Sequence, residues 1–408
     1  MLLQNRIERT IDQLRGRCSA PVRIELWNGR GFDLADNPSV VLRVNGPRAF
    51  GYLLSPSMDD LGKAFVEGHI DVEGPIDEVI RACIDLSRQG EGKPPRSALP
   101  RRESHSRETD RGAIEYHYDV SNDFYALFLD REMVYSCGYF RSPDDSLELA
   151  QQRKIDHILT KLRIAPGERL LDVGCGWGAL IVRAASKYGA IATGITLSRL
   201  QHEWALERIR REGLQDHCFV ELRDYRDVPG AGIYDKIASV GMFEHVGLAN
   251  LPEYFGALNR LLRPRGLVLN HGITSGTVEE GDVICGGGAF IERYVFPNGE
   301  LPHLSRTARD MSAAGLEVID VESLRRHYAL TCREWATRLE ARKAHAAALA
   351  GERRSRSWRI YLAGCAFGFD QGWVNVHQLL ACKSQGGEMG SQPLTRDYMY
   401  QGSRSSIE

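Results

Sequence analysis

The chain has 408 residues, 43% of them hydrophobic and 26% charged, so it is long enough for two or three globular domains. The 52 Lys and Arg residues nearly balance 54 Asp and Glu residues, and the net charge of -2 predicts no nucleic-acid partner. The nine cysteines form no CxxC pair and no export signal is recognisable, so we expect free thiols in the cytoplasm and no metal site. No uncharged apolar stretch approaches the roughly 18 residues that span a bilayer, so any membrane contact would be peripheral.

The pattern over residues 1–88 predicts a small α/β domain. Apolar residues between Leu2 and Leu14 have helical spacing, and basic residues lie among them. Residues 22–34 and 39–50 are expected to form strands, each with an Asn-Gly turn signal, and a helix closes the domain.

The remainder of the chain contains a linker, a larger domain and a tail. Residues 89–112 are rich in Pro, Gly, Ser and charge, which indicates a linker. In residues 113–385, short apolar strands alternate with helical stretches, which predicts a mostly parallel, doubly wound α/β sheet. Residues 386–408 are expected to be a polar tail. The expected strands are 169–174, 190–197, 218–223, 234–240 and 266–274.

A strand that leads into a Gly-rich turn marks the predicted ligand pocket. Asp172 precedes glycines 174, 176 and 178, which gives the pattern D-x-G-x-G-x-G. Glycine allows close backbone approach, and the helix that follows offers free N–H groups. The carboxylate of Asp172 suits the ammonium and sulfonium charges of S-adenosylmethionine (SAM), which has no pyrophosphate.

Two alternatives to SAM remain for this turn. Gly174, Gly176 and Ala179 also fit the weak dinucleotide pattern G-x-G-x-x-G/A. An NAD site would want an acidic residue after the second strand, where Thr196 and Ser198 stand instead. The pattern therefore favours SAM over NAD, and a turn without any ligand is the third interpretation.

Five ordered segments carry a specific resemblance to a known family. These are residues 115–140, 241–247, 270–274, 290–302 and 324–335. They resemble the cyclopropane-fatty-acyl-phospholipid synthase family, which includes the mycolic-acid cyclopropane synthases. The resemblance implies a Rossmann-like SAM-dependent methyltransferase domain that transfers a methylene group to the cis double bond of an unsaturated acyl chain. Residues 1–88 resemble the lipid-binding domain of the bacterial synthases, which points to phospholipid-borne chains.

The resemblance also implies that a bound bicarbonate ion is the base that closes the cyclopropane ring. The positions that match its ligands are the side chains of Cys137, Glu244, His271 and Tyr328 and the backbone of Ile273. Glu244 and His271 follow neighbouring apolar strands and should lie at the carboxyl edge of the sheet. We expect their titration to be coupled through the bicarbonate.

Taken singly, each of these side chains also has a structural interpretation. Cys137 could be a packed small hydrophobe, Glu244 a helix cap, and His271 a core histidine. Tyr328 alone would be a core residue. The agreement of all five positions with the family favours function.

The resemblance assigns six residues to the SAM site: Tyr135, Ser136, Gly174, Gly176, Thr196 and Gln201. Asp224 follows the strand at 218–223 and is expected to accept from the adenine amino group, with a solvated loop acid as the alternative. Asp172 is expected to help through the turn backbone. Cys175, inside the turn, is interpreted as a packing residue.

Methyl transfer to an alkene leaves a carbocation, which aromatic rings stabilise by cation–π attraction. The candidates are Tyr135, Tyr139, Phe140, Tyr294 and Phe296. The aromatic and Gly-rich segment 358–377 is predicted to be a core helix or, alternatively, part of the wall of an acyl tunnel.

The expected partner is unsaturated phospholipid at the membrane surface, met by a cytoplasmic protein at the inner face. The N-terminal helix and the basic runs at 93–111 and 352–359 would meet anionic headgroups, or else are solvated faces. The resemblance further implies a homodimer. Alternatives for function are a methyl-branched or methylene product, an acyl substrate outside phospholipid, and a lipid-binding scaffold without activity.

Overall fold

The computed structural model describes residues 2–15, 21–87, 112, 121–278, 288–296, 299–384 and 392–400. The chain divides into two compact units: unit 1 is Met1–Arg102, Asp282–Pro297 and Cys332–Gln371, and unit 2 is Glu103–Gly281, Asn298–Thr331 and Gly372–Glu408. Each predicted domain is one continuous segment of the chain, whereas each compact unit of the structure joins segments that are distant in sequence. Apart from residue 112 the predicted linker lies outside the described residues, as does most of the predicted tail.

Unit 2 contains a seven-stranded sheet of order β10-β11-β9-β8-β5-β6-β7. From β9 to β7 all neighbours are parallel, and β11 is antiparallel to both β9 and β10. The strands are β5 (Arg169–Val173), β6 (Ile191–Thr196), β7 (Cys218–Leu222), β8 (Tyr234–Val240), β9 (Leu262–Ser275), β10 (Leu316–Ser323) and β11 (Val374–Lys383). The mostly parallel sheet confirms the predicted fold, and all five predicted strands are present.

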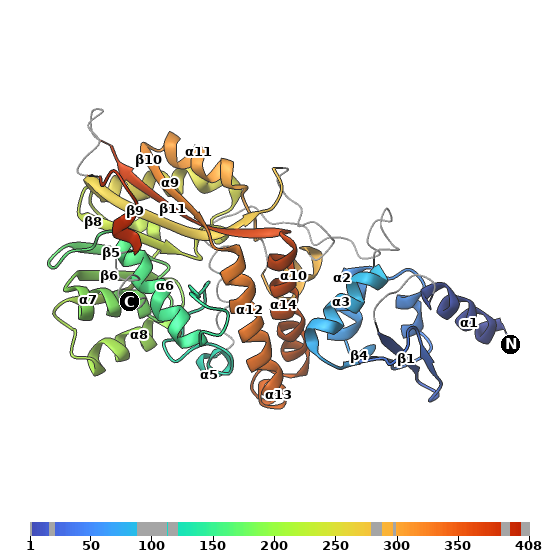
Figure 1. The fold of residues 1–408 in the computed structure, drawn as a ribbon. Helices are drawn as coiled ribbons and strands as arrows, with labels where there is room; N and C mark the ends of the chain where they lie inside the picture. The colour runs from blue at the N-terminus through green and yellow to red at the C-terminus, as the bar shows by residue number, and fades with distance from the viewer. Residues whose placement is uncertain are drawn as a thin grey trace, which may run out of the picture. The chain divides into compact units, whose positions relative to one another are not determined.

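Helices cover both faces of this sheet (Figure 1). On one face pack α6 (Leu147–Lys161), α7 (Ala179–Tyr188) and α8 (Arg199–Arg211), and on the other α9 (Leu251–Leu261) and α11 (Leu304–Ala313). Leu170 and Leu171, neighbours on β5, are both fully buried because they face opposite layers. The loops that follow β5, β6, β7 and β8 therefore share one edge of the sheet, where ligands bind in this architecture.

Shorter elements complete unit 2, and one helix is shared with unit 1. They are α5 (Asn122–Ala126), η3 (Tyr225–Asp227), η4 (Phe243–His245), η5 (Leu248–Asn250), α15 (Asp397–Tyr400) and the shared α12 (Arg325–Ala341). None of the helices that the structure describes is long and apolar enough to cross a membrane.

Unit 1 contains a four-stranded sheet of order β2-β1-β3-β4. Its strands are β1 (Val22–Leu26), β2 (Gly31–Asp33), β3 (Val40–Val44) and β4 (Ile70–Glu73). Its helices are α1 (Leu2–Arg15), η1 (Ala49–Leu53), α2 (Met58–Val66), α3 (Ile76–Ser87), α10 (Gly288–Tyr294), α13 (Lys343–Ala350) and α14 (Glu352–Gln371). The first Asn-Gly signal forms the predicted hairpin turn, with Gly29 at φ 80°. The second, at residues 45–46, ends β3 and leads into η1 instead of a strand.

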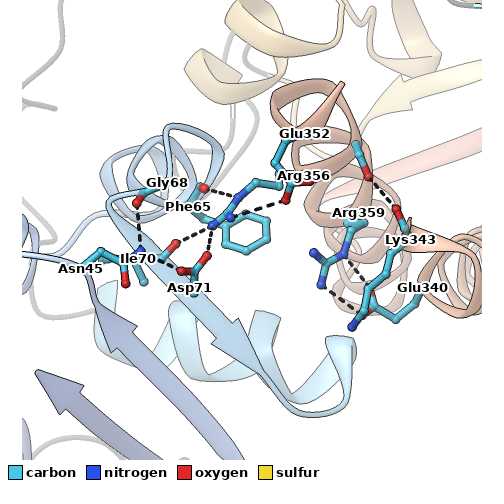
Figure 2. Close-up of polar contacts among 11 residues, drawn as sticks. Asn45, Phe65, Gly68, Ile70, Asp71, Glu340, Lys343, Glu352, Arg356 and Arg359 are labelled. Carbon is cyan, nitrogen blue, oxygen red and sulfur yellow. Dashed lines mark hydrogen bonds and ion pairs between the residues drawn. The ribbon is translucent and has the colours of Figure 1, made fainter. Parts of the chain in front are cut away.

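Arg356 of α14 joins segments of unit 1 that are nearly 300 residues apart in sequence (Figure 2). Its guanidinium donates to the Phe65 and Ile70 carbonyls at 2.6 and 2.7 Å and to Asp71 at 2.5 Å. Arg359, one turn later, pairs with Glu340 at 2.7 Å. Both side chains are largely buried. These two members of the predicted basic run therefore stabilise unit 1 and are not available to a membrane surface.

The segment predicted as a core helix or tunnel wall changes structure within its length. α14 ends at Gln371, and β11 begins at Val374 inside the sheet of unit 2. The helical prediction is therefore correct up to Gln371 and wrong beyond it. Gly372, at φ 75°, provides the left-handed residue that allows the helix to end there.

Candidate functional site

The glycine turn after β5 forms part of the wall of a cavity in unit 2. Gly174 and Gly176 have φ angles of 79° and 54°, in the left-handed region that favours glycine. A Cβ at Gly174 would also lie only 2.9 Å from Met242 Cγ. The cavity has an empty volume of about 1090 Å³. Its lining includes all eight residues predicted to hold SAM: Tyr135, Ser136, Asp172, Gly174, Gly176, Thr196, Gln201 and Asp224.

A capped helix places two of these residues. Ser198 begins α8 by accepting from the Gln201 backbone N–H at 3.3 Å. The Thr196 hydroxyl donates to Gln201 Oε1 at 2.8 Å, and both side chains are buried. The end of β6 and the first turn of α8 are thereby fixed against each other at the cavity wall.

Asp224 is not the solvated loop acid that was the alternative interpretation. Its carboxylate accepts from the Arg226 backbone N–H at 2.9 Å and pairs with the Arg226 guanidinium at 2.7 Å. Only 11% of its side chain is exposed. Asp224 therefore lies fixed in the cavity wall, as an adenine-binding residue would.

The segment 134–139 contains residues predicted for two ligands. Tyr135 and Ser136 are predicted to hold SAM, and Cys137 is predicted to hold bicarbonate. Helix α6 holds this segment through Gln151 Nε2, which donates to the Ser136 carbonyl at 2.8 Å, and through the Ala150 carbonyl, which accepts from Tyr139 N–H at 2.9 Å. From α12, the Thr331 hydroxyl accepts from Gly138 N–H at 2.9 Å.

Glu244 lies at the carboxyl end of β8 with its carboxylate turned onto the neighbouring strand β9. Its Oε1 accepts from the Ile273 backbone N–H at 2.7 Å. Its Oε2 is buried and makes no hydrogen bond to any residue that the structure describes. Burial raises the pKa of Glu244 to about 7, so the carboxyl carries a proton for much of the time near neutral pH. Glu244 lies in the first turn of η4, whose N-cap residue is Met242.

His271 lies on β9, two residues before Ile273. Its Nδ1 accepts from Gln378 Nε2 on β11 at 3.1 Å, which leaves the ring proton on Nε2. That Nε2 is buried and has no hydrogen-bond partner among the described residues. Burial, together with the charge of Lys154, holds the pKa of His271 well below its usual value. The ring is therefore a neutral donor, and it is not a satisfied core histidine.

The Cys137 thiol and the backbone N–H of Tyr328 both lie against the Leu324 carbonyl, which precedes α12. The fully buried Cys137 thiol lies 3.7 Å from the Leu324 carbonyl, at the start of the turn that carries Tyr328. Burial raises the pKa of this thiol, so it stays protonated and serves as a hydrogen-bond donor. Lys154 acts electrostatically on both Cys137 and His271.

The aromatic candidates are divided between the two units. Tyr135 lines the cavity, and Tyr139 stacks on His327 with ring centroids 4.8 Å apart. In unit 1 the Tyr294 hydroxyl donates to Glu67 at 2.9 Å, and Tyr294 packs in a cluster with Phe296. Cys175 packs in the core against Gly194, as predicted.

Three polar residues at the site were not singled out in the sequence. Lys154 donates to Ser136 Oγ at 2.8 Å, Gln378 orients His271, and Glu322 pairs with Lys161 at 2.5 Å. A signal for the lysines does exist in α6, because its inward-facing positions 151, 154, 157 and 161 are all polar at helical spacing.

Comparisons with known proteins identify the relatives of this chain. A family model described as mycolic acid cyclopropane synthetase matches residues 105–379, and one described as a domain of unknown function matches residues 11–89. A probable fatty acid methyltransferase of Pseudomonas putida is 51% identical over 383 residues, covering 93% of this chain and 96% of that protein. Cyclopropane mycolic acid synthase 1 of Mycobacterium tuberculosis is 37% identical over 280 residues, covering 66% and 96%.

A solved structure shares much of the fold of this chain. Mycolic acid cyclopropane synthase CmaA1, complexed with SAH and CTAB, superimposes with a TM-score of 0.63 at 37% identity. The match covers 67% of this chain and 98% of that one. The family model spans well over half of the present chain. This chain therefore belongs to the mycolic acid cyclopropane synthetase family, as a SAM-dependent methyltransferase related to fatty acid methyltransferases.

Proposed function

We propose that this methyltransferase adds a methylene group from SAM across the cis double bond of an unsaturated acyl chain, forming a cyclopropane. We further propose that the acyl chain belongs to a membrane phospholipid and that bound bicarbonate is the base. The observation that carries the proposal is the pair of buried polar atoms Glu244 Oε2 and His271 Nε2, which lack partners among the described residues. Leaving such atoms unpaired costs about 1–3 kcal/mol each, so a site that keeps both is suited to a small polar ligand.

The donor set suits bicarbonate. His271 Nε2–H and the protonated Cys137 thiol can donate to an oxyanion, and Glu244 with a pKa of about 7 can share a proton with it. The Ile273 N–H is already paired with Glu244, so its backbone acts here by orienting that carboxyl. When bound, bicarbonate would supply the base that removes a proton from the transferred methyl group.

The cavity residues supply binding and orientation for the methyl donor. When bound, SAM would supply an electrophilic methyl group, which a weakly nucleophilic alkene requires. Thr196, Gln201 and Asp224 are held by their own hydrogen bonds before any ligand arrives, so the wall is preorganised.

A methyl-branched or methylene product is the second candidate. The relative from Pseudomonas putida, which aligns with nearly the whole chain, is named a probable fatty acid methyltransferase. Loss of a proton from a neighbouring chain carbon would give a methyl-branched alkene. A 1,2-hydride shift onto the cationic carbon, followed by loss of a proton from the transferred methyl group, would give a methylene group. The intact set of Cys137, Glu244, His271 and Tyr328 favours ring closure.

One experiment separates these products. The full chain is incubated with SAM and vesicles of unsaturated phospholipid, and the acyl chains are examined by mass spectrometry before and after ozonolysis. A gain of one CH2 with loss of the alkene indicates a cyclopropane, whereas a retained alkene indicates a methylene or methyl-alkene product. Modification of free fatty acid but not of vesicles would contradict the phospholipid substrate.

Two further measurements test the remaining parts of the proposal. Buffer stripped of carbon dioxide should suppress turnover, and added bicarbonate should restore it; unchanged turnover would rule out the proposed base. We also propose a cytoplasmic homodimer that docks on the inner membrane face. Vesicle flotation and sedimentation equilibrium measure docking and dimerisation directly. The basic residues 101, 102 and 107, whose charge reversal should weaken docking, lie outside the described residues.

A further inference from the structure

Helix α6 presents a buried cation to the cavity wall. Lys154 is 3% exposed, lines the cavity, and lies one turn after Gln151 on the inward side of the helix. The mechanism proposed for this protein gives the N–H donors of Lys154 no role. Since burying a lysine is costly, a cation at this position calls for a counter-charge.

The ammonium group of Lys154 is incompletely satisfied by the protein. It has three N–H donors, and the one hydrogen bond it makes to a described residue is with Ser136 Oγ, at 2.8 Å. No ion pair holds it within the described residues. Asp130, which acts on Lys154 electrostatically, accepts from the backbone N–H groups of Glu132 and Val134 and forms no ion pair with the lysine. Donors therefore remain available to a ligand.

A buried acid lines the same cavity. Asp172 is 2% exposed, and its Oδ1 has no hydrogen-bond partner among the described residues. Lys154 and Asp172 act on each other electrostatically, but they do not form an ion pair. One wall therefore offers a cation and an acid that are not neutralised by direct contact.

An α-amino-acid zwitterion is the complement of such a wall. We propose that Lys154 binds the α-carboxylate of the methyl donor while Asp172 faces its α-ammonium, so that this wall recognises the amino-acid end of SAM. The proposal rests on SAM occupying this cavity. It gives Asp172 a direct role in place of the expected role through the turn backbone, and it makes Lys154 a binding residue.

The test is calorimetric binding of S-adenosylhomocysteine, which keeps the amino-acid end and has no methyl group to transfer. We expect Lys154→Met to weaken this binding at least tenfold in the full chain. Binding of decarboxylated S-adenosylmethionine, which lacks the α-carboxylate, should be nearly equal in the variant and the parent. Lys154→Gln, which keeps a donor and removes the charge, should show the same selective loss and serves if the methionine variant does not fold.

Lys236→Met is the matched control. Lys236 is also a buried lysine of unit 2, but it lies outside the cavity lining and pairs with Glu168 at 3.5 Å. Its removal should leave both affinities unchanged.

Three results would overturn the proposal. Failure of the parent to bind S-adenosylhomocysteine would contradict the SAM site itself. Equal affinities for S-adenosylhomocysteine in the parent and both Lys154 variants would contradict the role of Lys154 but not the SAM site. Unchanged affinities combined with a higher half-saturating bicarbonate concentration would assign Lys154 to that anion instead.

Discussion

The carboxylate of Glu244, after strand β8, accepts a hydrogen bond from the backbone N–H of Ile273 on strand β9 at 2.7 Å. This bond crosses two neighbouring parallel strands at the edge where their loops begin, and it leaves Glu244 Oε2 buried without a partner among the described residues. A buried oxygen without a hydrogen-bond partner lowers the stability of the fold, and such a group is kept where it serves function.

Replacing Glu244 with glutamine should reduce turnover at least 100-fold and stabilise the fold at alkaline pH. Burial raises the pKa of Glu244 from 4.5 to about 7, so the native state holds a proton that the unfolded state releases. Stability therefore falls as pH rises from about 4.5 to 7, by up to about 3 kcal/mol. Denaturant titration should show Glu244→Gln exceeding the parent at pH 8, with the difference shrinking toward pH 5. The exposed Glu253→Gln on α9 should show neither effect; an equal change there would contradict the assignment.

Gln378 should control which nitrogen of His271 carries the proton. Gln378→Leu removes the donor to Nδ1, so we expect turnover to fall about tenfold while S-adenosylhomocysteine binds normally. Gln378→Glu reverses the hydrogen bond and should move the proton to Nδ1, with a larger loss and an altered pH–rate profile. Identical profiles for both variants and the parent would show that Gln378 only fills space.

Gly272 has no room for a side chain. A Cβ there would lie 1.9 Å from the Phe243 ring, beside Glu244, and β9 is paired through this region to β11. Gly272→Ala should therefore lower the unfolding free energy by about 3 kcal/mol and disturb turnover. Gly256→Ala, in α9 with open space around it, should instead stabilise by about 0.5–1 kcal/mol. Thermal unfolding compares the two, and equal effects would contradict the predicted clash.

Glu322 should hold the buried charges of α6 in place. Burial alone would raise the pKa of Glu322. The hydrogen bond from His157 and the charge of the fully buried Lys161 outweigh burial and hold this pKa at about 2. Its stabilising effect is thus complete above about pH 4.5 and is lost as pH falls toward 2. Glu322→Gln should cost about 3 kcal/mol at pH 7 by leaving Lys161 poorly paired. The exposed Glu317→Gln on the same strand should cost little, and similar losses would refute the role of the pair.

Arg356 should be decisive for the folding of unit 1. Arg356→Met removes its bonds to the Phe65 and Ile70 carbonyls and leaves them buried (Figure 2). We expect a loss of about 2–4 kcal/mol, seen as faster hydrogen exchange in β4. Arg353→Met breaks the exposed pair with Glu67 and the contact with the Tyr294 ring, and it should cost no more than about 1 kcal/mol. Unchanged exchange in the Arg356 variant would show that α14 is held by its apolar contacts alone.

The sequence by itself determined the features that depend on local patterns. The D-x-G-x-G-x-G turn and the five parallel strands follow from residue spacing and turn chemistry, and the family segments added the expected site residues. Strands β10 and β11 were missed because their pairing partners are distant in sequence.

The tertiary structure decided which polar groups face each other and which remain unpaired. Only folding buries Lys154, Asp172, Glu244 and His271 away from water, and their charge states depend on that burial. The same is true of unit 1, where Arg356 joins β4 to a helix from the far end of the chain. A linear pattern identifies residue types at a spacing, whereas burial and unmet hydrogen bonds result from contacts between distant segments.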